Sequence, residues 1–214
     1  MTQSITQDKY LGDPCGTCAT AFWKNSCFKK PKGVKIMHEK DFQPAYEKDF
    51  HVTRYFRLIH NLQRIETGSL HKSYYFQTVN THTQKGTVAH LINRCYENAN
   101  ITLKQVDKWT KYKVFDNNLW IFIYETSSPY PVALGIADFD DEIKEGSLEW
   151  IQTLPEERGK GLGQALVTEL LLRLMSKANF VTVSGQKDNK TNPEALYRKC
   201  GFTGEDIWCV LTPK

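Results

Sequence analysis

The sequence lacks any apolar run long enough to cross a bilayer, and it does not begin with the basic and apolar segments of a secretion signal. An excess of charge is also missing, because 28 Lys and Arg face 24 Asp and Glu for a formal net charge of +4. That charge is too small to indicate a nucleic-acid-binding protein. We therefore expect a cytoplasmic protein that binds neither membrane nor nucleic acid.

Complete metal-ligand motifs are missing too. Cys15 and Cys18 have the spacing of half a zinc site or of a redox pair, but no second C-x-x-C and no H-x-x-x-H follows. A cytosolic setting also disfavours disulfides. We expect no metal, with Cys15, Cys18 and Cys27 as unpaired structural thiols; a metal or redox role is the alternative. The other three cysteines lie on apolar faces and are expected in the core: Cys95, Cys200 and Cys209.

Glycine and positive charge are concentrated in the stretch EERGKGLGQAL, residues 156–166. The residues from Ser147 to Leu154 alternate as a strand does, and Pro155 ends that strand. Downstream, apolar residues at helical spacing predict a helix from within the glycines to about Lys177; they are Leu162, Ala165, Leu166, Leu170, Leu174 and Met175. The start of such a helix has unpartnered N–H groups and a positive dipole. The pattern predicts a phosphate site.

Known phosphate loops fit this stretch unequally. A P-loop needs Ser or Thr after its Gly-Lys, but Gly161 follows Lys160, which also argues against a magnesium-dependent nucleotide hydrolase. The dinucleotide-binding fingerprint needs G-x-G-x-x-G and a later acid, and the glycines stand instead at positions 159, 161 and 163. A plain connecting turn is the remaining alternative.

The spacing Arg158-x-x-Gly161-x-Gly163 after a strand and a proline resembles the coenzyme A pyrophosphate loop of the GNAT superfamily of N-acetyltransferases. A second stretch, NFVTVSGQKDNKTNPEALYRKCGF, is similar to the superfamily's following strand, Asn-bearing turn and short helix with a Tyr and a closing Gly-Phe. Asn192, Tyr197, Gly201 and Phe202 match in that order. Asn192 also suits a helix N-cap, Pro193 the first helical position and Gly201 the position after the end.

The resemblance extends upstream to about Ser73. Further strands are expected at Tyr74–Val79, NLWIFIYE, PVALGIADF and DIWCVL, and helices at Thr83–Glu97 and Thr102–Tyr112, the latter with Leu103, Val106 and Trp109 inward. The implied class is α/β (α+β), a mixed central sheet flanked by helices, with residues 74–214 as the GNAT domain. Residues 1–73 would be an N-terminal extension packed on that core.

The resemblance implies an acetyltransferase that passes an acetyl group from acetyl-CoA directly to a primary amine in a ternary complex. The pantetheine arm would lie where the strand ending at Leu154 parts from the strand starting near Phe180, pairing with the backbone of Ile151 and Thr153. The diphosphate would bind the amides of Arg158, Gly159, Lys160, Gly161, Leu162 and Gly163, with Asn192 as a further contact. An inactive acyl-CoA-binding module is the alternative.

Tyr197 is the general acid that the resemblance implies, because its ordinary pKa of about 10 is close to that of a leaving thiol. The alternative is a packed aromatic. For the general base we favour Glu149, which shares a strand face with Ile151 and Thr153, over Glu145 and Asp138. A solvated surface carboxylate is the other interpretation of Glu149 and Glu145.

The segment YFRLIHNL, residues 55–62, alternates as a half-buried strand, and VKIMHEKDF resembles another strand. Such strands could extend the sheet or wall an acceptor pocket. We expect His60 to be a hydrogen-bonded buried histidine and Trp23 a packed aromatic, rather than pocket residues. The acceptor, a small molecule or a peptide amine, is not specified, and the sequence leaves open whether the protein is a monomer or a homodimer.

Overall fold

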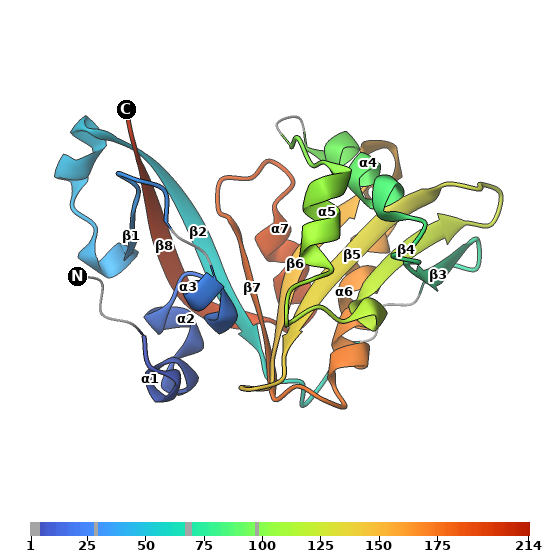
Figure 1. Ribbon diagram of the computed structural model, residues 1–214, viewed down its shortest axis with the longest axis horizontal. Helices are drawn as coiled ribbons and strands as arrows, with labels where there is room; N and C mark the ends of the chain where they lie inside the picture. The colour runs from blue at the N-terminus through green and yellow to red at the C-terminus, as the bar shows by residue number, and fades with distance from the viewer. Residues whose placement is uncertain (1–4, 28–29, 67–69, 97–98) are drawn as a thin grey trace.

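The computed structural model describes residues 5–27, 30–66, 70–96 and 99–214, which form one eight-stranded sheet with helices on both faces (Figure 1). The strands are β1 (Lys35–His38), β2 (Phe50–His60), β3 (Tyr74–Thr78), β4 (Trp120–Glu125), β5 (Pro131–Asp140), β6 (Glu145–Thr153), β7 (Phe180–Gln186) and β8 (Thr203–Pro213). Their order is β1-β8-β2-β7-β6-β5-β4-β3. Strands β6 and β7 run parallel, and the other described pairs are antiparallel. The predicted mixed sheet flanked by helices is confirmed.

The α-helices are α1 (Gln7–Gly12), α2 (Pro14–Thr17), α3 (Phe22–Cys27), α4 (Lys85–Cys95), α5 (Leu103–Trp109), α6 (Leu162–Leu174) and α7 (Pro193–Lys199). Short 3-10 turns are η1 (Glu39–Asp41), η2 (Pro44–Lys48), η3 (Asn117–Leu119) and η4 (Pro155–Glu157). None of these helices is both long and apolar enough to cross a membrane.

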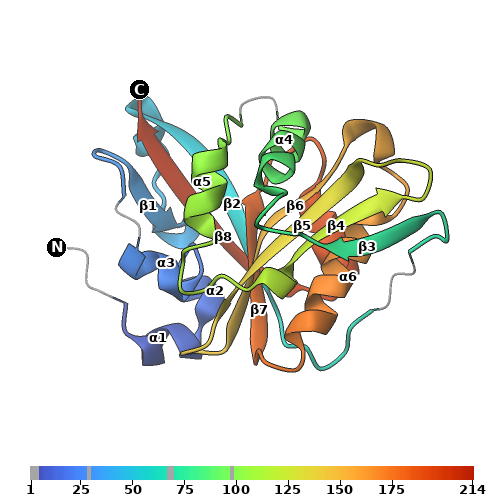
Figure 2. The ribbon, with the colours of Figure 1, turned by 45° about the vertical axis from the view of Figure 1, so that its right-hand side comes forward.

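Helix α6 packs closely against one face of the sheet, and a side chain at Gly135 would be crowded by it. A Cβ on Gly135 would lie 3.1 Å from Leu170 and 3.2 Å from Leu166. Figure 2 shows α4 and α5 on the opposite face, which they share with α1–α3. The apolar core fills the layers on both sides of β4, β5 and β6.

Strand β2 lies inside the sheet, between β7 and β8, and pairs antiparallel with both. The expected alternation is confirmed in part, since Phe56, Leu58 and His60 are buried. The strand is not half-buried as expected, because Arg57 on its other face is only 2% exposed. The boundary at residue 73 stays a prediction, although β1 and β2 are strands of the same sheet as the rest of the chain.

Two side chains that the helical pattern placed inward are exposed. Leu103 is 59% exposed because it is the first residue of α5, at the end of the helix away from the packed turn of Val106. Met175 is 53% exposed because α6 ends at Leu174 rather than near Lys177. The helix expected from Thr83 to Glu97 is α4, and Glu97 itself lies outside the described residues.

Candidate active site

The parallel strands β6 and β7 pair over only part of their length. Their register runs from Glu145 opposite Phe180 to Leu148 opposite Val183. Beyond Leu148, β6 is paired with β5 alone, while β7 continues along β2. The expected parting of the two strands is therefore confirmed. Ile151 and Thr153 lie in the part of β6 whose β7 side has no paired strand.

The glycine turn that follows β6 has a backbone that favours glycine. Gly159 and Gly161 have φ of 79° and 80°, in the left-handed region. Gly161 is the N-cap of α6, and its C=O accepts the first helical hydrogen bond from Ala165 at 3.0 Å. The Arg158 N–H, expected to bind the diphosphate, donates instead to the carbonyl oxygen of Pro155 at 3.4 Å. Within the described residues, the N–H groups of residues 159–164 have no protein hydrogen-bond partner. They therefore form a row of unsatisfied donors at a positive helix end.

The cations of this turn contact the chain itself. Lys160 Nζ lies 2.9 Å from Glu157 Oε1, and the hydroxyl of Tyr74 donates to Glu157 Oε2 at 3.0 Å. Arg158 Nη2 donates to the carbonyl oxygen of Cys95 at 3.4 Å. Because both cations have partners already, the main-chain amides are the more available anion ligands of this turn.

Helix α7 begins as the sequence indicated. Asn192 is its N-cap, in the left-handed region with φ of 47°, and its side chain accepts from the N–H of Ala195 at 3.4 Å. Pro193 is the first helical residue, and Gly201 follows the helix end with φ of 90°. Asn192 thus has a structural role as a cap, and the coenzyme contact expected of it stays a prediction.

Tyr197 lies on α7 and is buried, with its ring 6.0 Å from that of Phe56 and 5.8 Å from that of Phe202. Burial raises the pKa of its hydroxyl, and the charges of Tyr96, Cys200 and Glu149 add to that effect. The near match in acidity with a thiol, expected from an ordinary tyrosine, does not hold for Tyr197 in this structure. The raised pKa keeps the hydroxyl protonated, which a proton donor requires.

Glu149 lies in a β-bulge, where the register shifts between Ile136 and Ala137 of the neighbouring strand. Ser147 Oγ donates to Glu149 Oε1 at 3.0 Å, and Lys24 Nζ of α3 is ion-paired with Glu149 Oε2. The Glu149 side chain is 18% exposed. It is therefore an oriented, partly buried carboxylate rather than a freely solvated one.

Asp138 on β5 is a second carboxyl group beside Glu149. Burial raises its pKa well above the ordinary value, the charge of Glu149 raises it further, and the ammonium of Lys24 opposes this. Two carboxyls in such surroundings favour a state in which one holds a proton. Asp138 is thus poised as the neutral partner of the pair.

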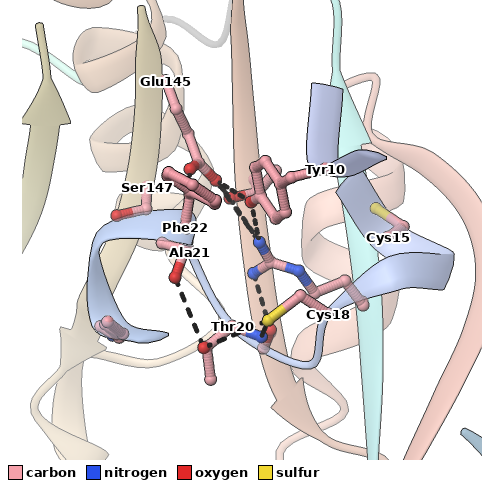
Figure 3. A network of polar contacts seen from close by, with 12 residues as sticks. Tyr10, Cys15, Cys18, Thr20, Ala21, Phe22, Glu145 and Ser147 are labelled. Carbon is pink, nitrogen blue, oxygen red and sulfur yellow. Dashed lines mark hydrogen bonds and ion pairs between the residues drawn. The ribbon is translucent and has the colours of Figure 1, made fainter. Parts of the chain in front are cut away.

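Glu145, the third carboxylate considered as a base, is buried in a network that fixes the N-terminal helices to the sheet (Figure 3). Tyr10 donates to Glu145 Oε1 at 2.6 Å and Thr182 does so at 2.5 Å, while the N–H of Phe22 donates to Oε2 at 3.0 Å. Arg57 Nη2 lies 3.4 Å from Oε1. The surface interpretation of Glu145 is wrong, because four donors surround it in the interior.

The N-terminal thiols lie beside this network. Cys15 and Cys18 are buried and free, Cys27 is exposed, and the two sulfur atoms of the C-x-x-C stretch lie apart in Figure 3. Burial raises the pKa of Cys15 to about 12. In the described ranges, no group of three or more His, Cys, Asp or Glu side chains is arranged to hold a metal ion.

The structural interpretation of His60 and Trp23 is confirmed. His60 is buried and its Nδ1 accepts from the N–H of Leu62 at 2.9 Å, and burial lowers its pKa. Trp23 is buried with its ring 5.3 Å from that of Tyr112.

Sequence reasoning missed Lys24 and Ser147 as partners of Glu149. Lys24 is 125 positions from Glu149 in the chain, so no spacing rule links the two. Ser147 could have been predicted as a partner, because residues two apart on a strand normally point to the same face and Ser147 precedes Glu149 by two.

The family model of the acetyltransferase (GNAT) domain matches residues 116–204, which include β6, the glycine turn, α6, β7 and α7. No curated protein matches the sequence significantly.

Solved structures share the fold. A GCN5-related N-acetyltransferase from Sphaerobacter thermophilus aligns at a TM-score of 0.70 and 14% identity, over 84% of this chain and 59% of that one. The ribosomal-protein-S18-alanine N-acetyltransferase of Escherichia coli aligns at a TM-score of 0.52 and 17% identity, over 65% of this chain and 93% of that one. A glucosamine N-acetyltransferase region of a fungal multi-domain β-N-acetylglucosaminidase aligns at 0.59 and 14%, over 78% of this chain and 22% of that one. The chain thus spans less than two thirds of the Sphaerobacter protein.

Proposed function

We propose that this chain, a member of the GNAT superfamily, transfers an acetyl group from acetyl-CoA to a primary amine by direct attack within a ternary complex. One observation carries the proposal: β6 and β7 part after Leu148, and β6 leads straight into a left-handed glycine turn at the start of α6. A thioester arm and a diphosphate need these two features next to each other.

In the proposed complex, the diphosphate accepts hydrogen bonds from the free N–H groups of residues 159–164. The pantetheine arm extends along the unpaired side of β6 at Ile151 and Thr153. The acetyl-thioester end would then lie near the start of the divergence, beside Glu149. Acetyl-CoA supplies the activated acyl group, and the residues of the chain orient it and move protons.

Glu149 is proposed to take a proton from the acceptor ammonium, since Ser147 orients one oxygen and the other faces a cation. The amine nitrogen then attacks the thioester carbon, the C–N bond forms and the C–S bond breaks. Tyr197 is proposed to give its proton to the departing thiolate, and the second proton of the attacking nitrogen then returns to Tyr197.

A thiol-release assay with acetyl-CoA and a panel of amines tests this function, with calorimetry for coenzyme binding. The fold neighbours are named for acceptors as different as a protein alanine and glucosamine, so the panel should include amino acids, peptides, polyamines and amino sugars. Glu149→Gln and Tyr197→Phe should each lower turnover about tenfold or more. Tight coenzyme binding with no turnover on any amine would favour the inactive binding module.

A further inference from the structure

Both oxygens of Glu149 have partners from within the chain. Ser147 Oγ donates to Oε1, and the ammonium of Lys24 pairs with Oε2. An ionised carboxylate can accept about four hydrogen bonds, and one of those that Glu149 receives comes from an amine. Lys24 therefore holds an amine nitrogen in direct contact with the proposed base.

The position of Lys24 is fixed by the fold rather than by a flexible tail. Phe22, two residues before it, donates its N–H to the buried carboxylate of Glu145 at 3.0 Å. Trp23 is 3% exposed, and the Lys24 ammonium lies 5.6 Å from the centre of its ring. The N–H of Lys24 donates to the carbonyl oxygen of Ala21 at 3.1 Å. This buried anchoring holds α3 over the sheet beside β6.

The Lys24 side chain is still reachable, since it is 26% exposed. Its ammonium is in direct contact with Glu149, the proposed proton acceptor. An amine held in a fixed attack geometry gains greatly over one that diffuses from solution.

We propose that Lys24 is an internal acceptor, so that the chain acetylates its own Lys24 when acetyl-CoA is bound and no competing amine is present. The inference rests on the proposed function and assigns to it a first acceptor. Glu149 takes one proton from the Lys24 ammonium, and the neutral amine attacks the thioester carbon. The C–N bond forms, the C–S bond breaks, Tyr197 protonates the thiolate, and the second nitrogen proton restores Tyr197. The products are an amide at Lys24, coenzyme A thiol and a protonated Glu149.

Site-resolved mass spectrometry of the purified 214-residue chain with acetyl-CoA tests the proposal. Lys177 is the matched control lysine, because it too is ion-paired with a carboxylate, Asp116, and is 25% exposed. Acetylation of Lys24 should be about tenfold or more faster than that of Lys177. Its rate constant should not change with protein concentration. Glu149→Gln should slow Lys24 about tenfold or more and leave Lys177 unaffected.

A second variant separates enzymatic from solution chemistry. Gly161→Val, which should weaken coenzyme binding through the loop backbone, should suppress labelling of Lys24 but not of Lys177. Equal rates at both lysines, or a Lys24 rate constant that rises with protein concentration, would overturn the proposal. If Lys24 stays unmodified while an external amine is acetylated, internal acetylation fails and the proposed function stands. If coenzyme A binds but neither Lys24 nor any amine is acetylated, both fail.

Discussion

The backbone of Gly161 offers the sharpest test of how the coenzyme is held. Its φ of 80° lies in the left-handed region, and a Cβ built there would meet no atom within 4 Å. A side chain at this position would therefore not collide with the protein, and its cost would come from backbone conformation. For an ordinary residue that cost is about 1–2 kcal/mol.

In the free protein, an alanine at position 161 can relieve this strain by leaving the left-handed region, which turns the N–H groups of Leu162 and Gly163 away from the diphosphate site. Coenzyme A binding must then restore the strained conformation, so we expect Gly161→Ala to weaken it about tenfold, because 1.4 kcal/mol corresponds to one factor of ten. Gly161→Val should weaken binding more, since β-branched residues are genuine outliers at positive φ. Isothermal calorimetry with coenzyme A measures these changes.

Gly161→Asn distinguishes a conformational cause from a steric one. Asn is larger than Ala but tolerates the left-handed region far better. Asn should therefore bind coenzyme A more tightly than Ala if backbone geometry decides, and less tightly if a side chain collides with the ligand. Gly86→Ala is the matched control, because Gly86 also has open space but lies within helix α4. Wild-type affinity for the Ala variant, or weaker binding by Asn than by Ala, would refute the reasoning.

Three further predictions concern stability and reactivity. Tyr10→Phe removes the hydroxyl donor that lies 2.6 Å from buried Glu145, so the free energy of unfolding measured in urea should fall by about 1–3 kcal/mol. The control Tyr130→Phe, at a 74% exposed residue, should leave that free energy unchanged. The pKa of Asp138 is raised in the folded protein, so its stabilising contribution is present below the unfolded pKa of about 4 and is lost as pH rises towards the folded pKa. The free energy of unfolding of Asp138→Asn should therefore increase relative to that of the wild type as pH rises through that window. A difference between the two proteins that stays constant across pH would contradict this. Among the thiols, exposed Cys27 should react with iodoacetamide at pH 8 in the native protein, whereas buried Cys200, whose pKa is raised to about 11, should react only after unfolding, as peptide mapping would show.

Local sequence patterns were sufficient to predict the strands, turns and helices of the second half of the chain. The strand, glycine turn and helix around Gly161 follow from proline, from glycines that accept positive φ, and from apolar residues at helical spacing. The cap of α7 at Asn192 likewise depends on a few neighbouring residues. The family assignment rests on these local signals, and the roles of Tyr197 and Glu149 stay predictions.

Other features could not be predicted from any local pattern of residues. Glu145 and Glu149 are both glutamates of one strand, yet four donors from distant segments surround the first and a lysine from α3 pairs with the second. The raised pKa of Tyr197 depends on burial against Phe56 of an N-terminal strand.

The sequence by itself determined which segments become strand, turn and helix near the candidate site, because those preferences act over a few residues. Only the tertiary structure decided that β2 enters the sheet between β7 and β8, and that α3 holds Lys24 against Glu149. The physical reason is that burial and Coulomb interactions depend on distance in space, and the chain brings together groups separated by more than a hundred residues.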